Sequence, residues 1–484
     1  MSFANKLIKS SFFIIAIRLV QRGIGIFSFL ILARILTPED FGIVSIATLL
    51  VFLCDILSET GAQQYIVHKE VVDDNDLNTS WTLGIILKSL LAIVLILASP
   101  FVASFYELPQ LTVVLQIIAL VLPLSALNNP KMLILKRNLD YKPFLTLAIY
   151  DKVLSFIFTM TLAFVLKSYW AMIFGVVFSY LVKLVMSYLI VSYQPKLTLK
   201  KFTEQWAFSK WVLLRALVGY GRSEFDTAFI SKLYGVEVLG GFTMMKNLST
   251  TPSREIIRPL VEPLLASFSK VRNNSQHLNE QIIKCITTLL LVIGPICVAM
   301  TLFDRELVQV LFNEKWYKFA DIVGMLSILI LNMALASILR EALVSLGKVR
   351  FLFYFDTISF IFTIGFIYVL VGDGNIEKFI ILNIISNILS TLFLLFYITR
   401  YFEFDFWSLF ITNFPLLLVS TFFLTVDIKI VFENAYLNLI LNGFLYIIFF
   451  IFLLVITMLL FRRVSAIESY QKWLISMFSG FIKR

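Results

Sequence analysis

The feature that most limits the fold of this chain is a series of apolar runs, each close to the length of a membrane span. One run is FIIAIRLVQRGIGIFSFLILARIL, from Phe13 to Leu36. A helix needs about 20 mostly apolar residues to cross a hydrocarbon core of roughly 30 Å. Only 15% of the residues are charged, whereas soluble domains have about 25%. The runs therefore predict a polytopic membrane protein.

The apolar runs are continuous rather than alternating, so we expect an all-α fold and exclude a β-barrel. The length rule gives about 14 transmembrane helices. Their ends are set by Gly, Pro, Asn and charged residues, and the expected ranges are 10–35, 41–57, 80–105, 111–127, 144–166, 169–191, 211–233, 238–267, 280–302, 321–346, 351–371, 379–401, 409–425 and 437–461.

The Lys and Arg residues of the loops set the expected orientation. With a cytoplasmic N-terminus, about 22 of them fall inside and about 8 outside, so the positive-inside rule places both termini in the cytoplasm. The formal net charge of +10 then reflects the cytoplasmic loops and requires no nucleic-acid partner. The three cysteines and two histidines have no metal-ligand spacing, and we expect neither a metal nor a cofactor.

An internal repeat divides the chain. ARILTPEDFGIVSI, after the first helix, resembles SKLYGVEVLGGFTM, after the seventh, and aligns Glu39 with Glu237 and Gly42 with Gly240. LSFIFT at 154–159 and ISFIFT at 358–363 recur at a similar offset. The two copies have the same expected topology. We expect six-helix lobes at 1–200 and 201–402, two additional helices at 403–462, and an amphipathic cytoplasmic tail at 463–484.

Basic side chains inside the expected spans are the candidate substrate-binding residues. A Lys or Arg at the bilayer centre costs about 2.5–3.5 kcal/mol, so such residues face protein or a wet cavity. Arg18 and Arg22 lie four residues apart, on one helix face. In the eighth segment, three prolines are expected to break or kink the helix. The candidates are Arg18, Arg22, Lys88, Lys183, Arg215, Arg222, Arg254 and Arg258.

These cations outnumber the anions in the first, third, sixth and seventh helices, which favours an anionic substrate. Guanidinium groups match phosphate and pyrophosphate in bidentate geometry. Structural ion pairing is the alternative, for example between Arg222 and Asp226, or between Arg18 and Asp55 or Glu59. The acidic residues at depth are candidates for H⁺ or Na⁺ coupling, or for ion-pair partners: Asp55, Asp151, Glu224, Asp226 and Asp356.

Three segments carry a family resemblance: LARILTPEDFGIVSIATLL, LKRNLDYKPF and RPLVEPLLASFSKVR. They resemble Wzx-type bacterial polysaccharide flippases, the O-antigen and colanic acid-like exporters of lipopolysaccharide biosynthesis in the multidrug/oligosaccharidyl-lipid/polysaccharide exporter (MOP) superfamily. The resemblance implies two six-helix lobes around a central cavity, with Arg18, Arg22, Arg215 and Arg222 facing it. It implies a flippase of the bacterial inner membrane, not an enzyme, that moves undecaprenyl-pyrophosphate-linked oligosaccharide to the periplasmic leaflet by alternating access. Polysaccharide polymerases are its implied partners.

Other functions stay open. A peptidoglycan-lipid flippase or a drug exporter of the same superfamily is one alternative, although the basic excess disfavours a drug cavity. A membrane glycosyltransferase or polymerase would need catalytic groups in a sizeable exposed loop, and the largest outward loop, FDRELVQVLFNEKWYKFAD, is short. The acidic run VVDDNDLN at 71–78 does not match an EF-hand, and we expect it to be a solvated cytoplasmic loop.

Overall fold

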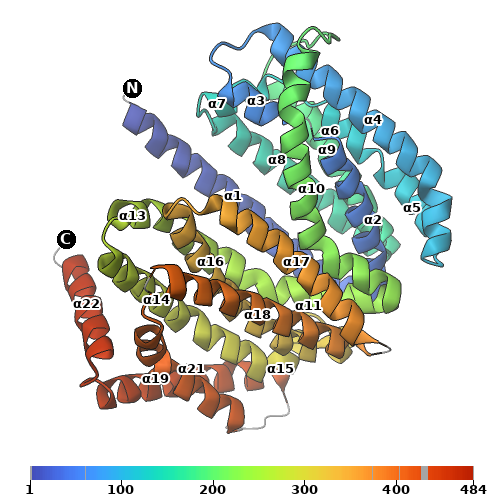
Figure 1. Ribbon diagram of the computed structural model, residues 1–484. Coiled ribbons are helices and arrows are strands. Elements are labelled where there is room, and N and C mark those ends of the chain that lie inside the picture. Colours follow the sequence, from blue (N-terminus) through green and yellow to red (C-terminus); the bar gives the residue numbers. More distant parts are fainter. Residues whose placement is uncertain (1–2, 60, 373, 403, 427–433, 483–484) are drawn as a thin grey trace. The chain divides into compact units, whose positions relative to one another are not determined.

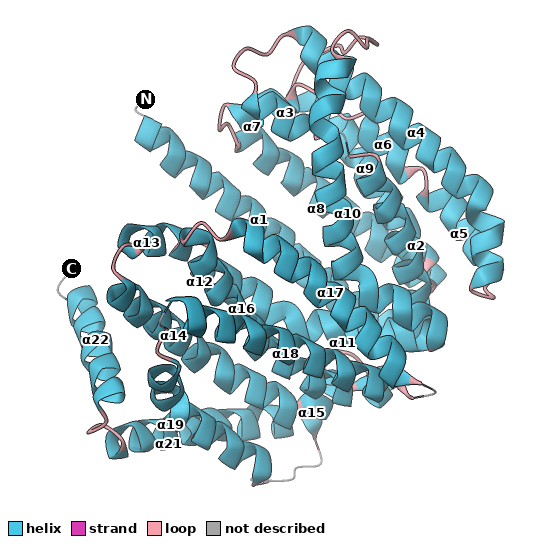
Figure 2. Ribbon diagram, in the orientation of Figure 1, coloured by secondary structure: helices cyan, strands magenta, loops and turns pink. Residues whose placement is uncertain are grey.

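The computed structural model is all-helical in the residues that it describes, which are 3–59, 61–372, 374–402, 404–426 and 434–482 (Figure 2). No strand occurs in these ranges, which confirms the expected all-α class. The chain folds into two compact units, Met1–Thr243 and Met244–Arg484 (Figure 1).

The first unit is built from long helices that pack in pairs. Helix α1 packs on α8, α8 on α9, and α10 on α2. The short helices α3 and α7 contact each other. The helices are α1 (Phe3–Ile35), α2 (Pro38–Leu57), α3 (Ala62–His68), α4 (Asp74–Phe105), α5 (Leu111–Ile118), α6 (Val121–Ala126), α7 (Met132–Arg137), α8 (Lys142–Leu166), α9 (Trp170–Ile190), α10 (Phe202–Leu233) and the first half of α11 (Gly235–Pro252).

The second unit is centred on α14 and α16, with α18 against α16 and α19 against α14. Aromatic rings of Phe423, Tyr446 and Phe450 fill its core beside α14. Its elements are η1 (Ser253–Ile257), α12 (Arg258–Val261), α13 (Leu264–Val271), α14 (Ser275–Leu302), α15 (Asp304–Leu311), η2 (Glu314–Phe319), α16 (Asp321–Ser345), α17 (Val349–Val371), α18 (Ile376–Phe402), α19 (Phe406–Thr425), α20 (Ala435–Leu437), η3 (Asn438–Asn442), α21 (Gly443–Leu460) and α22 (Ser465–Ile482).

Eleven helices of the described residues are long and apolar enough to cross a membrane. The expected count of 14 is therefore not confirmed, and the three remaining segments each differ for a physical reason. Segment 111–127 is divided between the short helices α5 and α6. Segment 238–267 breaks into α11, the π-helical η1, α12 and α13 around its prolines, as predicted. Helix α10 is continuous but carries charged residues within its apolar stretch.

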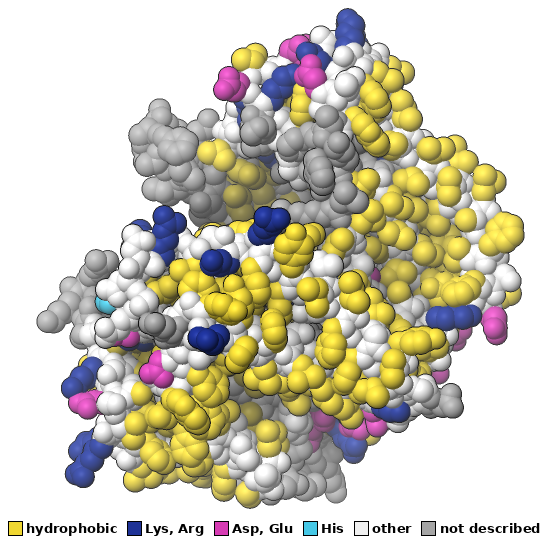
Figure 3. Space-filling view, viewed as in Figure 1, with side chains coloured by type: hydrophobic (Ala, Val, Ile, Leu, Met, Phe, Trp, Pro, Cys, Tyr) yellow, Lys and Arg dark blue, Asp and Glu magenta, His cyan; other side chains and the backbone are white. Residues whose placement is uncertain are grey.

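The outer faces of the long helices are apolar. On α4, exposed hydrophobic side chains recur every three or four residues at Ile86, Leu90, Ile93, Leu97 and Phe101. Figure 3 shows hydrophobic side chains covering the region of α4 and α5. A continuous stripe of this kind on a helix marks a surface that another apolar medium covers, which for a spanning helix is lipid.

Small residues bring α8 and α9 close together. Ala163 on α8 and Ala171 on α9 are fully buried. A Cβ on Gly175 would lie 2.2 Å from the Thr159 hydroxyl oxygen, so a larger residue at that position would force Thr159 to move. Close backbone approach at small side chains is the usual way in which helices associate within a bilayer, where the hydrophobic effect between helices is lost. The same packing fixes the polar groups that these two helices carry.

The acidic run at 71–78 is not the solvated loop that we expected. Asp73 caps α4, and its side chain and that of Asp76 each accept a hydrogen bond from the other's backbone N–H. Asp76 is fully buried, 2.6 Å from Lys69 Nζ, and accepts a hydrogen bond from the Tyr65 hydroxyl. Lys69 also donates to Glu204 in the first turn of α10, and the Glu204 carboxylate lies 3.1 Å from the Tyr65 hydroxyl oxygen. This polar cluster fastens the start of α10 to α3 and α4.

The segment between α9 and α10 is held by side chains of α4. Backbone N–H groups of Lys196, Thr198 and Lys201 donate to the Asn78, Thr82 and Thr79 side chains, at 3.0, 3.0 and 3.3 Å. The linker thus follows the first turns of α4, and α10 belongs to the first compact unit. The lobe boundary at 200/201 that the repeat indicates stays a prediction.

Candidate substrate and ion-coupling site

Helices α2 and α4 bring together one expected substrate cation and one expected coupling acid. Lys88 Nζ lies 2.7 Å from Asp55 Oδ1 and donates a hydrogen bond to Ser125 Oγ at 2.9 Å. Asp55 Oδ1 is buried, and among the described residues no donor meets hydrogen-bond geometry at this oxygen. The contact is therefore a close charge pair without a well-directed hydrogen bond. The sequence suggests Arg18 as a partner for Asp55 and does not predict Lys88.

A second pair joins α8 and α9. Asp151 is only 1% exposed, and its Oδ1 accepts hydrogen bonds from Ser179 at 2.5 Å and from Ser155 at 3.3 Å. Lys183 Nζ lies 3.6 Å from Asp151 Oδ2 and 4.6 Å from the centre of the Tyr180 ring. A buried carboxylate needs a cation and several donors to offset its desolvation, and Asp151 has both.

Tyr180 lies beside the second pair, with Lys183 Nζ 4.6 Å from the centre of its ring. Both pairs lie inside the first unit. Lys88 and Lys183 each contact an acid, so neither is an isolated positive charge.

The arginines of the first unit lie on α1 and α10. Arg18 is exposed and Arg22 is half-buried, both on α1, whereas Arg222 is exposed on α10. Arg215 is also on α10, but its side chain lies outside the described residues. The adjacent acids of α10 are half-buried, and Glu224 accepts a hydrogen bond from Thr227 at 3.1 Å, while Asp226 follows two residues later.

The remaining candidates belong to the second unit. Arg254 lies in the π-helical segment η1, is exposed, and donates a long hydrogen bond of 3.5 Å to Asn247 Oδ1. Arg258 begins α12 and is exposed. Further along, Asp356 on α17 contacts Arg340 on α16, so this acid at depth is part of an ion pair. Arg254 thus lies on π-helical backbone, which is frequent at functional sites, and Arg258 follows directly after it.

The repeated sequence segments contact each other inside the first unit. Gly42 on α2 lies against the backbone at Val236, and Gly240 on α11 lies against the backbone at Pro38. Ser45 Oγ is 3.5 Å from Thr243 Oγ1. The Tyr220 hydroxyl donates to Leu49 O and joins α10 to α2 a little further along. Glycines are required here because the two helices approach with almost no space between their backbones.

Spans of this length, lipid-facing stripes and buried ion pairs define a multi-pass membrane protein with a charged interior. The chain belongs to the polysaccharide biosynthesis protein family, whose sequence profile matches residues 31–321. It is similar to the "Uncharacterized membrane protein in cps region" of Klebsiella pneumoniae, with 23% identity over 408 residues that cover 82% of this chain and 83% of that protein.

Two further similarities agree with this family. The lipopolysaccharide biosynthesis protein WzxC of Escherichia coli K12 is 19% identical over 383 residues, which are 76% of each chain. Among solved structures, the lipid II flippase MurJ in an inward closed conformation aligns with a TM-score of 0.73 and 16% identity, over 93% of this chain and 99% of that chain. The chain thus shares the fold of that flippase and belongs to a family of polysaccharide biosynthesis proteins.

Proposed function

We propose that the chain is a flippase that moves undecaprenyl-pyrophosphate-linked oligosaccharide from the cytoplasmic to the periplasmic leaflet of the bacterial inner membrane. The observation that carries this proposal is the fold shared with a lipid II flippase over nearly the whole of both chains. Membership of the polysaccharide biosynthesis family supports a saccharide cargo. Both termini lie in the cytoplasm in this proposal, where polysaccharide polymerases and their precursors are potential partners.

The proposal assigns pyrophosphate recognition to Arg18, Arg22 and Arg222. A guanidinium group offers several N–H donors in a fixed plane and stays charged at any cellular pH, which suits a pyrophosphate inside a membrane protein. Arg215 lies on the same helix as Arg222. Arg254 and Arg258, in the broken eighth segment, contact the head group as it enters. Lys88 and Lys183 have a different task here because each lies beside an acid.

The paired residues suit ion coupling. When Asp55 takes up a proton or Na⁺, its negative charge is neutralised and the charge of Lys88 becomes available to an anionic head group. When Asp55 loses that ion, it attracts Lys88 again and weakens the hold on the anion. Asp55 is better suited than Asp151, because Asp151 is satisfied by two hydroxyl groups as well as by Lys183. Glu224 and Asp226 are further coupling candidates on α10.

The test is a leaflet-transfer assay in proteoliposomes with a fluorescent undecaprenyl-pyrophosphate disaccharide. The triple variant Arg18→Gln, Arg22→Gln, Arg222→Gln should lose at least about tenfold in transfer rate, the effect of about 1.4 kcal/mol or more. Arg462→Gln, in the exposed turn after α21, is the matched control and should transfer at the wild-type rate. Full activity of the triple variant would refute the site, and inactivity of the wild-type chain would refute the function.

A peptidoglycan-lipid flippase is the second candidate, because the fold similarity is to a lipid II flippase. The same assay separates the two when lipid II and the polymer-type disaccharide lipid are offered in parallel. Faster transfer of lipid II would favour the second candidate.

A further inference from the structure

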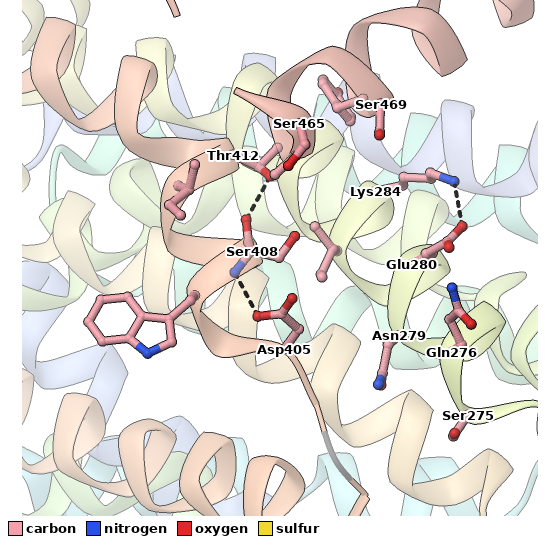
Figure 4. A pocket seen from close by; sticks show the side chains of 15 residues that line it. Ser275, Gln276, Asn279, Glu280, Lys284, Asp405, Ser408, Thr412, Ser465 and Ser469 are labelled. Atoms are coloured by element: carbon pink, nitrogen blue, oxygen red, sulfur yellow. Dashed lines mark hydrogen bonds and ion pairs between the residues drawn. The ribbon is translucent and has the colours of Figure 1, made fainter. Parts of the chain in front are cut away.

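A cavity of about 640 Å³, with many polar side chains among its lining residues, lies in the second unit, between the first turns of α14, the first turns of α19 and the start of α22 (Figure 4). Small-molecule sites have volumes of about 300–1,000 Å³. The cavity contains none of the residues assigned to flipping. It lies at the N-terminal ends of two spanning helices, so it is accessible from water rather than from the bilayer centre.

The lining offers many neutral hydrogen-bonding groups. Figure 4 shows Gln276 and Asn279 on one side, Ser408 and Thr412 on another, and Ser465 and Ser469 on the third. Within the described part of the chain, no hydrogen bond involves the side chains of Gln276, Ser465 and Ser469. They are donors and acceptors available to a ligand.

The charges of the lining do not favour an anion. Lys284 lies 3.3 Å from Glu280, so its charge is balanced, and Asp405 adds a second carboxylate. One Asp405 oxygen accepts from the Ser408 N–H at 2.9 Å, which leaves the other oxygen for a ligand hydroxyl or amine. A phosphate or carboxylate would meet net negative charge here, whereas a neutral polyol would not.

The walls of the cavity are fixed before any ligand arrives. On α22, Ile467 and Tyr470 are buried, and the Tyr470 hydroxyl is hydrogen-bonded to Thr288 at 3.0 Å. Thr412 is buried and bonds back to Ser408 O. A preformed site costs less ordering entropy on binding than a site that must assemble.

An exposed aromatic ring stands at one edge of the cavity. Trp407 is 68% exposed and lines both this cavity and an adjoining apolar groove of about 410 Å³, together with Phe396 and Phe404. An indole face packs well on the apolar C–H face of a sugar ring while hydroxyl and amide groups bond the ring edge.

We propose that this cavity binds a neutral saccharide of one or two rings. The sugar hydroxyls bond to Gln276, Ser465, Ser469 and Asp405, and one ring packs on Trp407. The site goes beyond the proposed flippase function and does not rest on it, because its residues are separate from the arginines and their ion pairs. The ligand is either a free saccharide or the sugar head of an amphiphile whose chain lies in the adjoining groove.

The experiment uses the full chain in nanodiscs, because detergents with sugar head groups would compete. Binding of maltose, lactose and N-acetylglucosamine is measured by calorimetry, and hexyl maltoside below its micelle concentration is compared with maltose. We expect saturable binding of at least one saccharide, weakened tenfold or more in the variant Gln276→Ala, Ser469→Ala. Ser476→Ala, on α22 outside the cavity, should bind like the wild type.

A local measurement keeps the proposal testable if the double variant does not fold. In a chain without its native cysteines, Ser469→Cys should be protected from maleimide by the bound saccharide, and Ser476→Cys should not. Equal affinities of maltose and hexyl maltoside assign the site to free saccharides, and a tenfold gain with the hexyl chain assigns it to amphiphiles. No saturable binding of any probe, or equal labelling of Ser469→Cys with and without sugar, overturns the proposal. Loss of flipping alone would not affect it.

Discussion

Gly42 and Gly240 occupy equivalent positions of the repeat. Each packs against the backbone at the start of the helix that carries the other glycine. A Cβ on Gly42 would lie 1.9 Å from Val236 O, and a Cβ on Gly240 would lie 1.7 Å from Pro38 O. Ser45 and Thr243, the contacting pair one turn further on, are 198 residues apart, the same spacing as between the two glycines. The repeat copies therefore meet through symmetry-related residues.

Alanine at Gly42 or Gly240 should destabilise the protein. Alanine improves helix propensity by about 1 kcal/mol, but the obstructing atoms are backbone and cannot rotate away. Overpacking costs about 1–3 kcal/mol, so after the gain in helix propensity we expect a net loss of up to about 2 kcal/mol for each variant. Thermal unfolding of the purified chain measures it. Gly84→Ala, where nothing lies within 4 Å, is the control and should be neutral or stabilising.

A cross-link between positions 45 and 243 should stop transport. The two side-chain oxygens are 3.5 Å apart, so cysteines placed there can form a disulfide. If transport requires α2 and α11 to separate at this point, oxidation of Ser45→Cys, Thr243→Cys abolishes leaflet transfer and a reductant restores it. Each single variant, oxidised in the same way, should stay active. Undiminished transfer by the cross-linked chain would show that the contact persists throughout the cycle.

Neutralising Asp151 alone should destabilise the protein more than replacing both Asp151 and Lys183. Asp151→Asn leaves Lys183 beside a neutral amide, and we expect a loss of about 2–3 kcal/mol, below the range for a fully buried pair because the Lys183 side chain is 31% exposed. Adding Lys183→Met should recover part of that loss. A double-mutant cycle on thermal stability measures the coupling, and strictly additive losses would show that the pair contributes no interaction.

The cluster around Glu204 should make stability depend on pH at the acidic end. Hydrogen bonds from Lys201, then from Lys69 and Tyr65, hold the pKa of Glu204 below its usual value. Its contribution is therefore present above the ordinary glutamate pKa and is lost as pH falls through the lower folded value. The melting temperature of the wild type should exceed that of Glu204→Gln at pH 7, and the gap should close on acidification. A constant gap would contradict this assignment.

The same cluster raises the pKa of Lys69, whereas it lowers the pKa of Glu204. Burial alone would lower the pKa of Lys69, but hydrogen bonds to Asp76, Tyr65 and Glu204 outweigh it and raise the pKa. Burial raises the pKa of Tyr65 to about 12. Lys69→Met should therefore be destabilising at neutral pH, and the difference from the wild type should shrink only as the solution becomes strongly alkaline.

Hydropathy and proline positions were sufficient to predict most of the helices. Long apolar runs become helices because every backbone polar group must be bonded within the segment in lipid. The prolines at 252, 259 and 263 predict a broken or kinked segment, and the chain there is divided among α11, η1, α12 and α13. The short helices α5 and α6 were not anticipated, because their combined length and composition match those of one span.

The charged residues were harder to place, because their partners come from distant helices. Nothing local to Lys88 indicates Asp55, and the pair Lys183–Asp151 joins residues that only helix packing brings together. The sequence does carry a local signal at the start of α4. Asp73 and Asp76, three residues apart ahead of an apolar run, form a capping box, which predicts a helix start rather than a solvated loop.

The side chains that hold the α9–α10 linker also fix how long it can be. Asn78, Thr79 and Thr82 accept from Lys196, Lys201 and Thr198 at positions set by the pitch of α4. One extra residue between Lys196 and Lys201 would change the spacing of these N–H groups and move them past their acceptors. This exposed connection is therefore a poor place for an epitope or fluorescent insertion, although its surface position suggests the opposite.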